Sequence, residues 1–359
     1  MEDFLYKKNY IINNKNNLYL TNPEPMLQYI DKKVVELMQE QDEEKRAELK
    51  TKILDDVYKI IKFDVKNSTM IEPIGGFESE NEKKLFINKH ITKLSLIYYL
   101  GNIYLNYHTN LILNSELSKR IPVIANMKTT IRFEEIYDRA LKEYLDTLYI
   151  GKQNMDKLAQ EMAKNGQTKP IVITNEHAYG TTFILPTLIE RFLIIQLDSK
   201  IMHSLFEELS QKIKLEKITL TEEEQKFYDI FSSDEMVKEI PCSQKYGRKF
   251  LYDMFLKYKI VTEEDKDTKL IFFKEFIDIE NGKNSKITLG NMITSKYINS
   301  FFKKEYSKLL NMLFKPEELN VRNNIAHANS ENSDYLSLPI TAIMMQLLWD
   351  ILREDIFEK

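Results

Sequence analysis

The sequence contains a single cysteine, Cys242, so it has no cysteine pair for an intramolecular disulfide bond and no cysteine-built metal site. Glycine and proline are also scarce, with nine of each in 359 residues. Because these residues form turns and end helices, their scarcity favours long helices over many short strands. A reducing, cytoplasmic setting is the simplest interpretation of the cysteine usage.

The chain also lacks a strong excess of either charge. Its 51 Lys and Arg against 55 Asp and Glu give a net charge of −4. No global basic field therefore attracts nucleic acid, and any contact with RNA must use a local patch. Hydrophobic residues make up 43% and charged residues 30%, which is ordinary for a soluble globular protein.

No long uninterrupted apolar run is present. The most apolar stretch, 183–197, is short for a membrane span and carries Glu190 and Arg191 at its middle. The first 17 residues are polar and have no apolar core of the kind that signal peptides contain. We therefore expect a buried core helix at 183–197 and no contact with a membrane.

Apolar residues recur at helical spacing through most of the chain, which predicts an all-α fold. The expected helices begin near residue 22 and also cover 80–114, 129–150, 183–197, a start at 221, 288–314 and 339–357. Residues 1–20 are expected to be an irregular lead-in, and the charged stretch 39–52 an exposed connection between helices. The polar, Gly- and Pro-containing segment 165–170 is the best boundary, so we predict a helical N-terminal domain at 1–165, of unknown role, and a second helical domain at 166–359.

The predicted helix at 288–314 carries two separate stripes. Its apolar stripe is Ile298, Phe302, Tyr306, Leu309 and Leu313. Lys304, Lys308 and Lys315 form the other stripe, with Tyr297 and Phe301 near its edge. The lysines have two interpretations: an ordinary solvated face, or a phosphate track with aromatic rings available for base stacking.

Immediately after this helix comes the string Asn320–Ala328, which contains Arg322, Asn323 and His327. On a helix Asn323 and His327 share a face, whereas Arg322 and His327 lie about 140° apart around the axis. A histidine moves protons near neutral pH, and an arginine offers fixed, forked donors to a phosphate. One chain therefore offers part of a site, and two copies facing each other would complete it. The alternative is a structural Arg and His that serve packing and capping at a helix start.

This string resembles the R-N-x-x-A-H active-site signature of the HEPN superfamily, many members of which are metal-independent ribonucleases. From residue 166 onward the chain is similar to the HEPN-like domain of endoplasmic-reticulum-associated RNA degradation proteins and their bacterial relatives. The resemblance covers about half the chain and depends on three stretches, of which the last is the most specific: Leu185–Arg191, Ile287–Met292 and Leu319–Ala328.

The resemblance implies an all-helical bundle that cleaves RNA as a homodimer, in RNA turnover or as a toxin or defence effector. Arg322, Asn323 and His327 would be its catalytic residues, with Lys304, Lys308 and Lys315 binding RNA. In HEPN toxins that are regulated by nucleotidylation a tyrosine follows two residues after the histidine, but here that residue is Asn329. This departure argues against that regulation, and any regulatory partner protein stays unknown. The alternative function is a non-catalytic helical module that binds RNA or protein.

Charged residues outside the motif have two interpretations as well. Glu190 and Arg191 sit in a strongly apolar segment and must find partners, either as a structural ion pair or with Glu190 orienting Arg322 or His327. His90 and His108 have no second ligand at helical ligand spacing. The sequence therefore implies no metal ion and no other cofactor.

Overall fold

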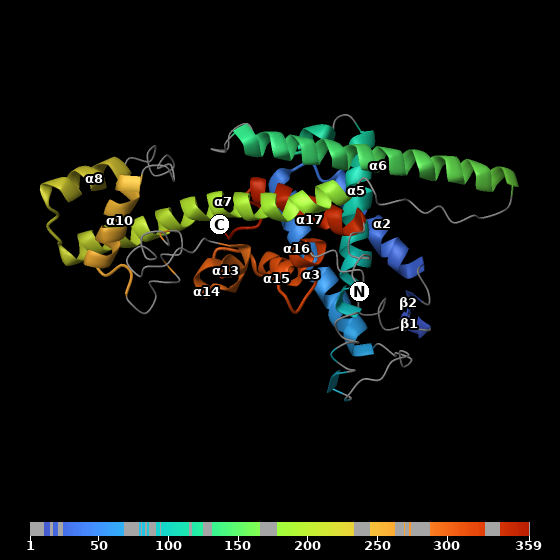
Figure 1. The fold of residues 1–359 in the computed structure, drawn as a ribbon, viewed down its shortest axis with the longest axis horizontal. Coiled ribbons are helices and arrows are strands. Elements are labelled where there is room, and N and C mark those ends of the chain that lie inside the picture. Colours follow the sequence, from blue (N-terminus) through green and yellow to red (C-terminus); the bar gives the residue numbers. More distant parts are fainter. Residues whose placement is uncertain are drawn as a thin grey trace. The chain divides into compact units, whose positions relative to one another are not determined.

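Figure 1 shows the computed structural model, in which helices dominate. The all-α class holds for the described residues apart from one short β-hairpin. The structure describes residues 11–14, 17–20, 24–67, 79, 81, 82, 85, 91–93, 95–114, 117–124, 131–165, 178–232, 245–262, 269, 273, 288–326 and 338–358.

The described residues form two compact units. Unit 1 draws on three parts of the chain, 1–125, 129–189 and 304–355. Unit 2 draws on 126–128, 190–303 and 356–359. These units do not coincide with the domains predicted from the sequence, because the C-terminal helices pack with the N-terminal ones. The proposed linker after residue 165 lies outside the described residues.

The hairpin pairs strand β1, Ile11–Asn14, with strand β2, Asn17–Leu20. The strands are antiparallel, with Ile11 opposite Leu20. The prediction of an irregular lead-in was wrong for these residues. Two short apolar runs on either side of an Asn- and Lys-rich centre are a hairpin pattern, which the helical composition of the rest of the chain obscured.

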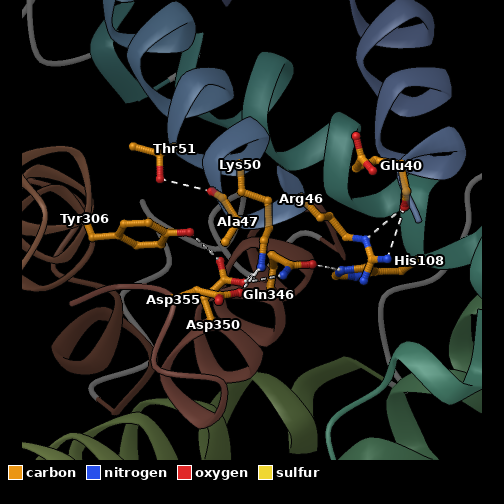
Figure 2. A network of polar contacts seen from close by, with 10 residues as sticks. All are labelled: Glu40, Arg46, Ala47, Lys50, Thr51, His108, Tyr306, Gln346, Asp350 and Asp355. Atoms are coloured by element: carbon orange, nitrogen blue, oxygen red, sulfur yellow. Dashed lines mark hydrogen bonds and ion pairs between the residues drawn. The ribbon is translucent and has the colours of Figure 1, made fainter. Parts of the chain in front are cut away.

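Helices α2, Glu24–Gln39, and α3, Glu43–Asn67, follow the hairpin. Helix α2 begins at the predicted Asn-Pro-Glu-Pro start. The turn between the helices is closed by Arg46, whose Nε and Nη2 donate to the carbonyl oxygen of Glu40 at 3.2 and 3.1 Å (Figure 2). The guanidinium thus satisfies a carbonyl that the end of α2 leaves without a helical donor.

The charged stretch 39–52 was predicted to be exposed, and this is wrong for two of its charged residues. Arg46 is 3% exposed and Lys50 is 2% exposed. Both lie on the face of α3 that packs into unit 1. A charged residue can be buried where the core supplies a partner for it.

A π-helix, Ile97–Gly101, runs directly into α5, Asn102–Leu113. Gly101 lies against Pro339 at the start of α17, Leu338–Leu352. A Cβ at this glycine would come within 2.7 Å of the proline Cβ, so only glycine permits this approach. The contact brings the π-helix and α5 against the last helix of unit 1.

The short 3₁₀ helix η2, Leu117–Arg120, precedes α6, Ile131–Asn165. Helix α6 was predicted to end near residue 150 but continues to Asn165. The hydroxyl of Tyr137 donates to the Pro122 carbonyl at 2.8 Å and ties the start of α6 to the preceding turn.

Helix α7, Ala178–Glu216, contains the predicted core helix and tolerates Pro186 in its interior. Its buried apolar residues include Leu185, Leu188, Ile189, Phe192, Leu193 and Leu197. The prediction of a core helix is confirmed. Part of α7 is long and apolar enough to cross a membrane, but half of its apolar window is already buried, and core helices pass the same test.

Helix α8, Glu222–Ser232, begins with the predicted capping box. The Thr221 hydroxyl accepts from the Glu224 N–H at 3.2 Å, and the Glu224 carboxylate accepts from the Thr221 N–H at 2.9 Å. The next described helix of unit 2 is α10, Lys245–Lys257.

The predicted single helix over 288–314 is wrong, because three helices cover this stretch. They are α13, Leu289–Thr294, α14, Lys296–Asn299, and α15, Lys304–Phe314. The first break is at Ser295, whose hydroxyl accepts from a backbone N–H three residues later at 3.3 Å and so caps a new helix. The predicted apolar stripe is nevertheless buried throughout: Ile298, Phe302, Tyr306, Leu309 and Leu313.

Helix α16, Val321–Ala326, follows α15. Helix α17 begins at the predicted Pro339 position, ends at Leu352 rather than near 357, and is buried on nearly every side. Trp349 lies in this core. Because a helix that is apolar all round must be surrounded by other elements, α17 forms the centre of unit 1.

Candidate functional site

The turn between α15 and α16 fixes the beginning of the predicted motif. Leu319 and Val321 are 2% and 1% exposed, and the Leu319 N–H donates to the Met312 carbonyl at 3.0 Å. Asn320, between them, has φ 45°, a left-handed conformation that asparagine adopts more readily than most residues. Two buried anchors and this left-handed residue set where α16 begins.

Arg322 and Asn323 both lie on the exposed side of α16. Neither side chain is part of the apolar core. His327 lies outside the described residues, and its predicted position beside Asn323 stays a prediction.

The predicted RNA-binding lysines lie on α15 and at its end. Lys304 and Lys308 are exposed and one helical turn apart, and Lys315 is half-buried. Lys308 places its Nζ 5.0 Å from the centre of the Tyr58 ring. All three lysines belong to unit 1, as does Arg322, so the structure brings these predicted residues into one compact unit.

Glu190 belongs to unit 2 and contacts the start of α13. Its Oε2 accepts the backbone N–H of Leu289 at 2.8 Å. This N–H is at the first turn of α13, where helices leave donors without helical partners. The geometry gives Glu190 a helix-capping role. Its predicted action on Arg322 or His327 stays a prediction.

A buried ionic cluster supports α15 from the inside (Figure 2). Lys50 of α3 donates to Asp350 of α17 at 2.5 Å and also to Asp355 in the turn that follows. Tyr306 of α15 donates its hydroxyl to the other oxygen of Asp350 at 2.9 Å. The four side chains tie α3, α15 and α17 together at the centre of unit 1.

Burial opposes the charged form of Lys50, but the attraction of Asp350 and Asp355 outweighs it and raises the pKa of the lysine. Lys50 therefore stays charged at physiological pH. Burial also raises the pKa of Asp355, although Lys50 opposes this shift. Removing one partner from such a cluster leaves an uncompensated buried charge.

The cluster continues through Gln346 to His108 (Figure 2). The Gln346 amide donates to Asp350 at 2.7 Å, and its oxygen lies 2.8 Å from His108 Nε2. His108 Nδ1 lies 2.8 Å from the Tyr144 hydroxyl. The chain of hydrogen bonds thereby also links α5 and α6 to α17. Because these groups are buried, they serve to hold the helices that carry the exposed residues.

Burial lowers the pKa of His108 to about 4, with the Gln346 hydrogen bond opposing the shift. Since the folded pKa lies below the unfolded value of 6.5, the neutral imidazole contributes stability above pH 6.5. That contribution is lost as the pH falls toward 4 and amounts to about 3 kcal/mol.

We therefore expect His108→Gln to flatten the loss of stability between pH 6.5 and pH 4. Urea unfolding at a series of pH values measures this slope. The control is His203→Gln, because the His203 side chain on α7 is 59% exposed and should leave the slope unchanged. If His108→Gln kept the wild-type slope, the buried neutral imidazole would not be the cause.

The ionic contacts of the buried cluster were not predicted from the sequence. Asp350 gave a usable signal, because it is an acidic residue in an otherwise apolar helix and must find a cationic partner. Nothing in the sequence identifies that partner, since Lys50 is 300 positions away in a charged stretch. The role of Tyr58 could not be predicted either, because the residue lies in an ordinary helical pattern.

No protein-family profile, curated protein or solved structure matches this chain. The geometry of the described residues and the motif in the sequence therefore carry the functional argument.

Proposed function

We propose that the chain is a metal-independent endoribonuclease of the HEPN type that acts as a homodimer. The observation that carries the proposal is the exposure of Arg322 and Asn323 on α16, in the unit that also holds the exposed lysines of α15. A motif that served only packing would turn these side chains into the core. The helices of 304–355, which carry the lysines and the motif, belong to unit 1, and the N-terminal helices complete their core.

The proposed reaction is an attack of the RNA 2′-hydroxyl oxygen on the adjacent phosphorus, which breaks the bond to the 5′ oxygen. His327 takes up the hydroxyl proton, and a histidine also returns a proton to the leaving oxygen. Arg322 stabilises the negative charge on the phosphoryl oxygens in the transition state. Asn323 orients the imidazole. The products are a 2′,3′-cyclic phosphate and a 5′-hydroxyl.

The lysines of α15 have a separate role in this proposal. Lys304, Lys308 and Lys315 neutralise phosphates along the RNA, which contributes affinity without sequence preference. The cellular role that fits such a nuclease is RNA turnover or the action of a toxin or defence effector.

A homodimer supplies the groups that one chain lacks. If α16 continues as a helix, Arg322 and His327 of one chain flank each other at about 140° instead of converging. Two motifs facing each other across a twofold axis would provide two arginines and two histidines in one groove. Each active groove would then combine residues of both chains.

The experiment that tests this arrangement mixes two inactive variants, Arg322→Ala and His327→Ala, after separate purification. In a mixed dimer, the His327→Ala chain supplies an intact Arg322 and the Arg322→Ala chain supplies an intact His327. The shared groove then holds one of each residue, so part of the RNA cleavage activity should return. Activity that never returns, together with sedimentation showing a monomer that cleaves RNA, would contradict the dimer. If the wild type binds RNA but cleaves none, the protein is the non-catalytic binding module instead.

A further inference from the structure

Tyr58 on α3 makes two contacts with the helix that carries the lysines. Its hydroxyl donates to the backbone carbonyl of Glu305 at 2.7 Å. Its ring lies beneath the Lys308 ammonium, with the Nζ 5.0 Å from the ring centre. Glu305 and Lys308 are one turn apart on α15, so the tyrosine is fixed at its hydroxyl while its ring face meets the lysine.

The hydroxyl keeps its role as a donor over the working pH range. Burial raises the pKa of Tyr58 well above its usual value, and the nearby Glu305 carboxylate adds to this. Tyr58 as a whole residue is partly buried, and Lys308 remains exposed to solvent. The ammonium is thus held over an aromatic face without being removed from reach of a ligand.

We propose that Tyr58 is a positioning residue that presents the Lys308 ammonium to an RNA phosphate. The proposal rests on the proposed function, in which Lys308 binds RNA. A cation over an aromatic face is attracted by the ring quadrupole. Holding the flexible lysine side chain in place before RNA arrives reduces the conformational entropy that binding would otherwise remove.

This assignment gives the N-terminal half of the chain a part in RNA binding. Helix α3 supplies the ring, and α15 supplies the cation. The sequence offered no role for residues 1–165, whereas the structure places one of their aromatic rings directly under a predicted phosphate-binding lysine.

The test is a double-mutant cycle on binding of a single-stranded RNA whose 2′-O-methyl groups prevent cleavage. Tyr58→Leu should weaken binding two- to fivefold, the loss that corresponds to one cation–π contact at an exposed site. In a Lys308→Ala background the same change should have no further effect. Tyr58→Phe keeps the ring and should bind like the wild type. Lys304→Ala is the matched control. When it is combined with Tyr58→Leu, the fold-losses in RNA affinity of the two single variants should multiply.

A second measurement does not depend on the leucine variant folding. In the wild-type protein the ring current of Tyr58 should move the Lys308 ε-methylene proton resonance upfield of other exposed lysines. The loss of that resonance in Lys308→Arg assigns it. An unshifted resonance, or equal effects of Tyr58→Leu with and without Lys308, would overturn the positioning role while RNA cleavage by the wild type stands. A wild type that binds no RNA would overturn both this role and the proposed function.

Discussion

Replacing Lys50 with methionine is expected to lower the free energy of unfolding by about 3–5 kcal/mol at pH 7. The ammonium contacts Asp350 and Asp355, and its side chain is 2% exposed. Without it, Asp350 and Asp355 lose the ammonium that contacts both of them in the core. Urea unfolding followed by circular dichroism measures the loss.

The matched control is Lys52→Met, because Lys52 is exposed on the same helix. It should change stability by less than about 0.5 kcal/mol. Adding Asp350→Asn to Lys50→Met should recover part of the loss, since it removes one of the two carboxylates that Lys50 contacts while the amide oxygen still accepts from Tyr306. Equal stability of Lys50→Met and Lys52→Met would contradict the central role given to the cluster.

Replacing Arg322 with alanine is expected to lower kcat for RNA cleavage by about 10²–10³-fold, the usual effect of removing one donor that stabilises transition-state charge. Because the side chain is exposed, the free energy of unfolding should change by less than about 0.5 kcal/mol. Single-turnover cleavage of a labelled RNA separates this loss from any loss in binding.

Two comparisons sharpen the Arg322 result. Arg322→Lys keeps the charge but not the forked donors, so it should restore only part of the rate. Arg132→Ala removes an exposed arginine from α6 and should leave cleavage unchanged. A rate for Arg322→Ala equal to that of Arg132→Ala would remove Arg322 from the reaction.

Features that depend on nearby residues could be predicted from the sequence. The capping box of α8 joins two residues three positions apart, and Pro339 marks the first turn of α17 through its fixed φ angle. The apolar stripe that extends through α15 followed from helical spacing alone. Arg322 and Asn323 were found in the same way, from a short string of residues.

Features that depend on distant partners could not be predicted. The charged composition of 39–52 indicated exposure, and only the fold reveals that Lys50 meets two carboxylates near the other end of the chain. The break between α14 and α15 was missed because the apolar helical period of Ile298, Phe302 and Tyr306 continues across it. Residues 304–355 group with the N-terminal helices and not with 190–303 for the same reason, since tertiary contacts override sequence proximity.

The same limit applies to the candidate site. The motif and the lysines are close together in the sequence, so they could be predicted together as one candidate site. Tyr58 is about 250 positions from Lys308, and its contact exists only because α3 and α15 pack together. A local pattern can therefore identify the residues that face a ligand, but not the residues that hold them in place.

The most direct test of the proposed nuclease incubates the purified wild-type protein with RNA in EDTA and determines the chemistry of the new ends. The mechanism predicts cleavage that survives EDTA and leaves 2′,3′-cyclic phosphate and 5′-hydroxyl ends, with no cleavage by His327→Ala. Cleavage that requires added Mg²⁺ or Mn²⁺ and leaves 5′-phosphate ends, or equal cleavage by the wild type and His327→Ala, would contradict it.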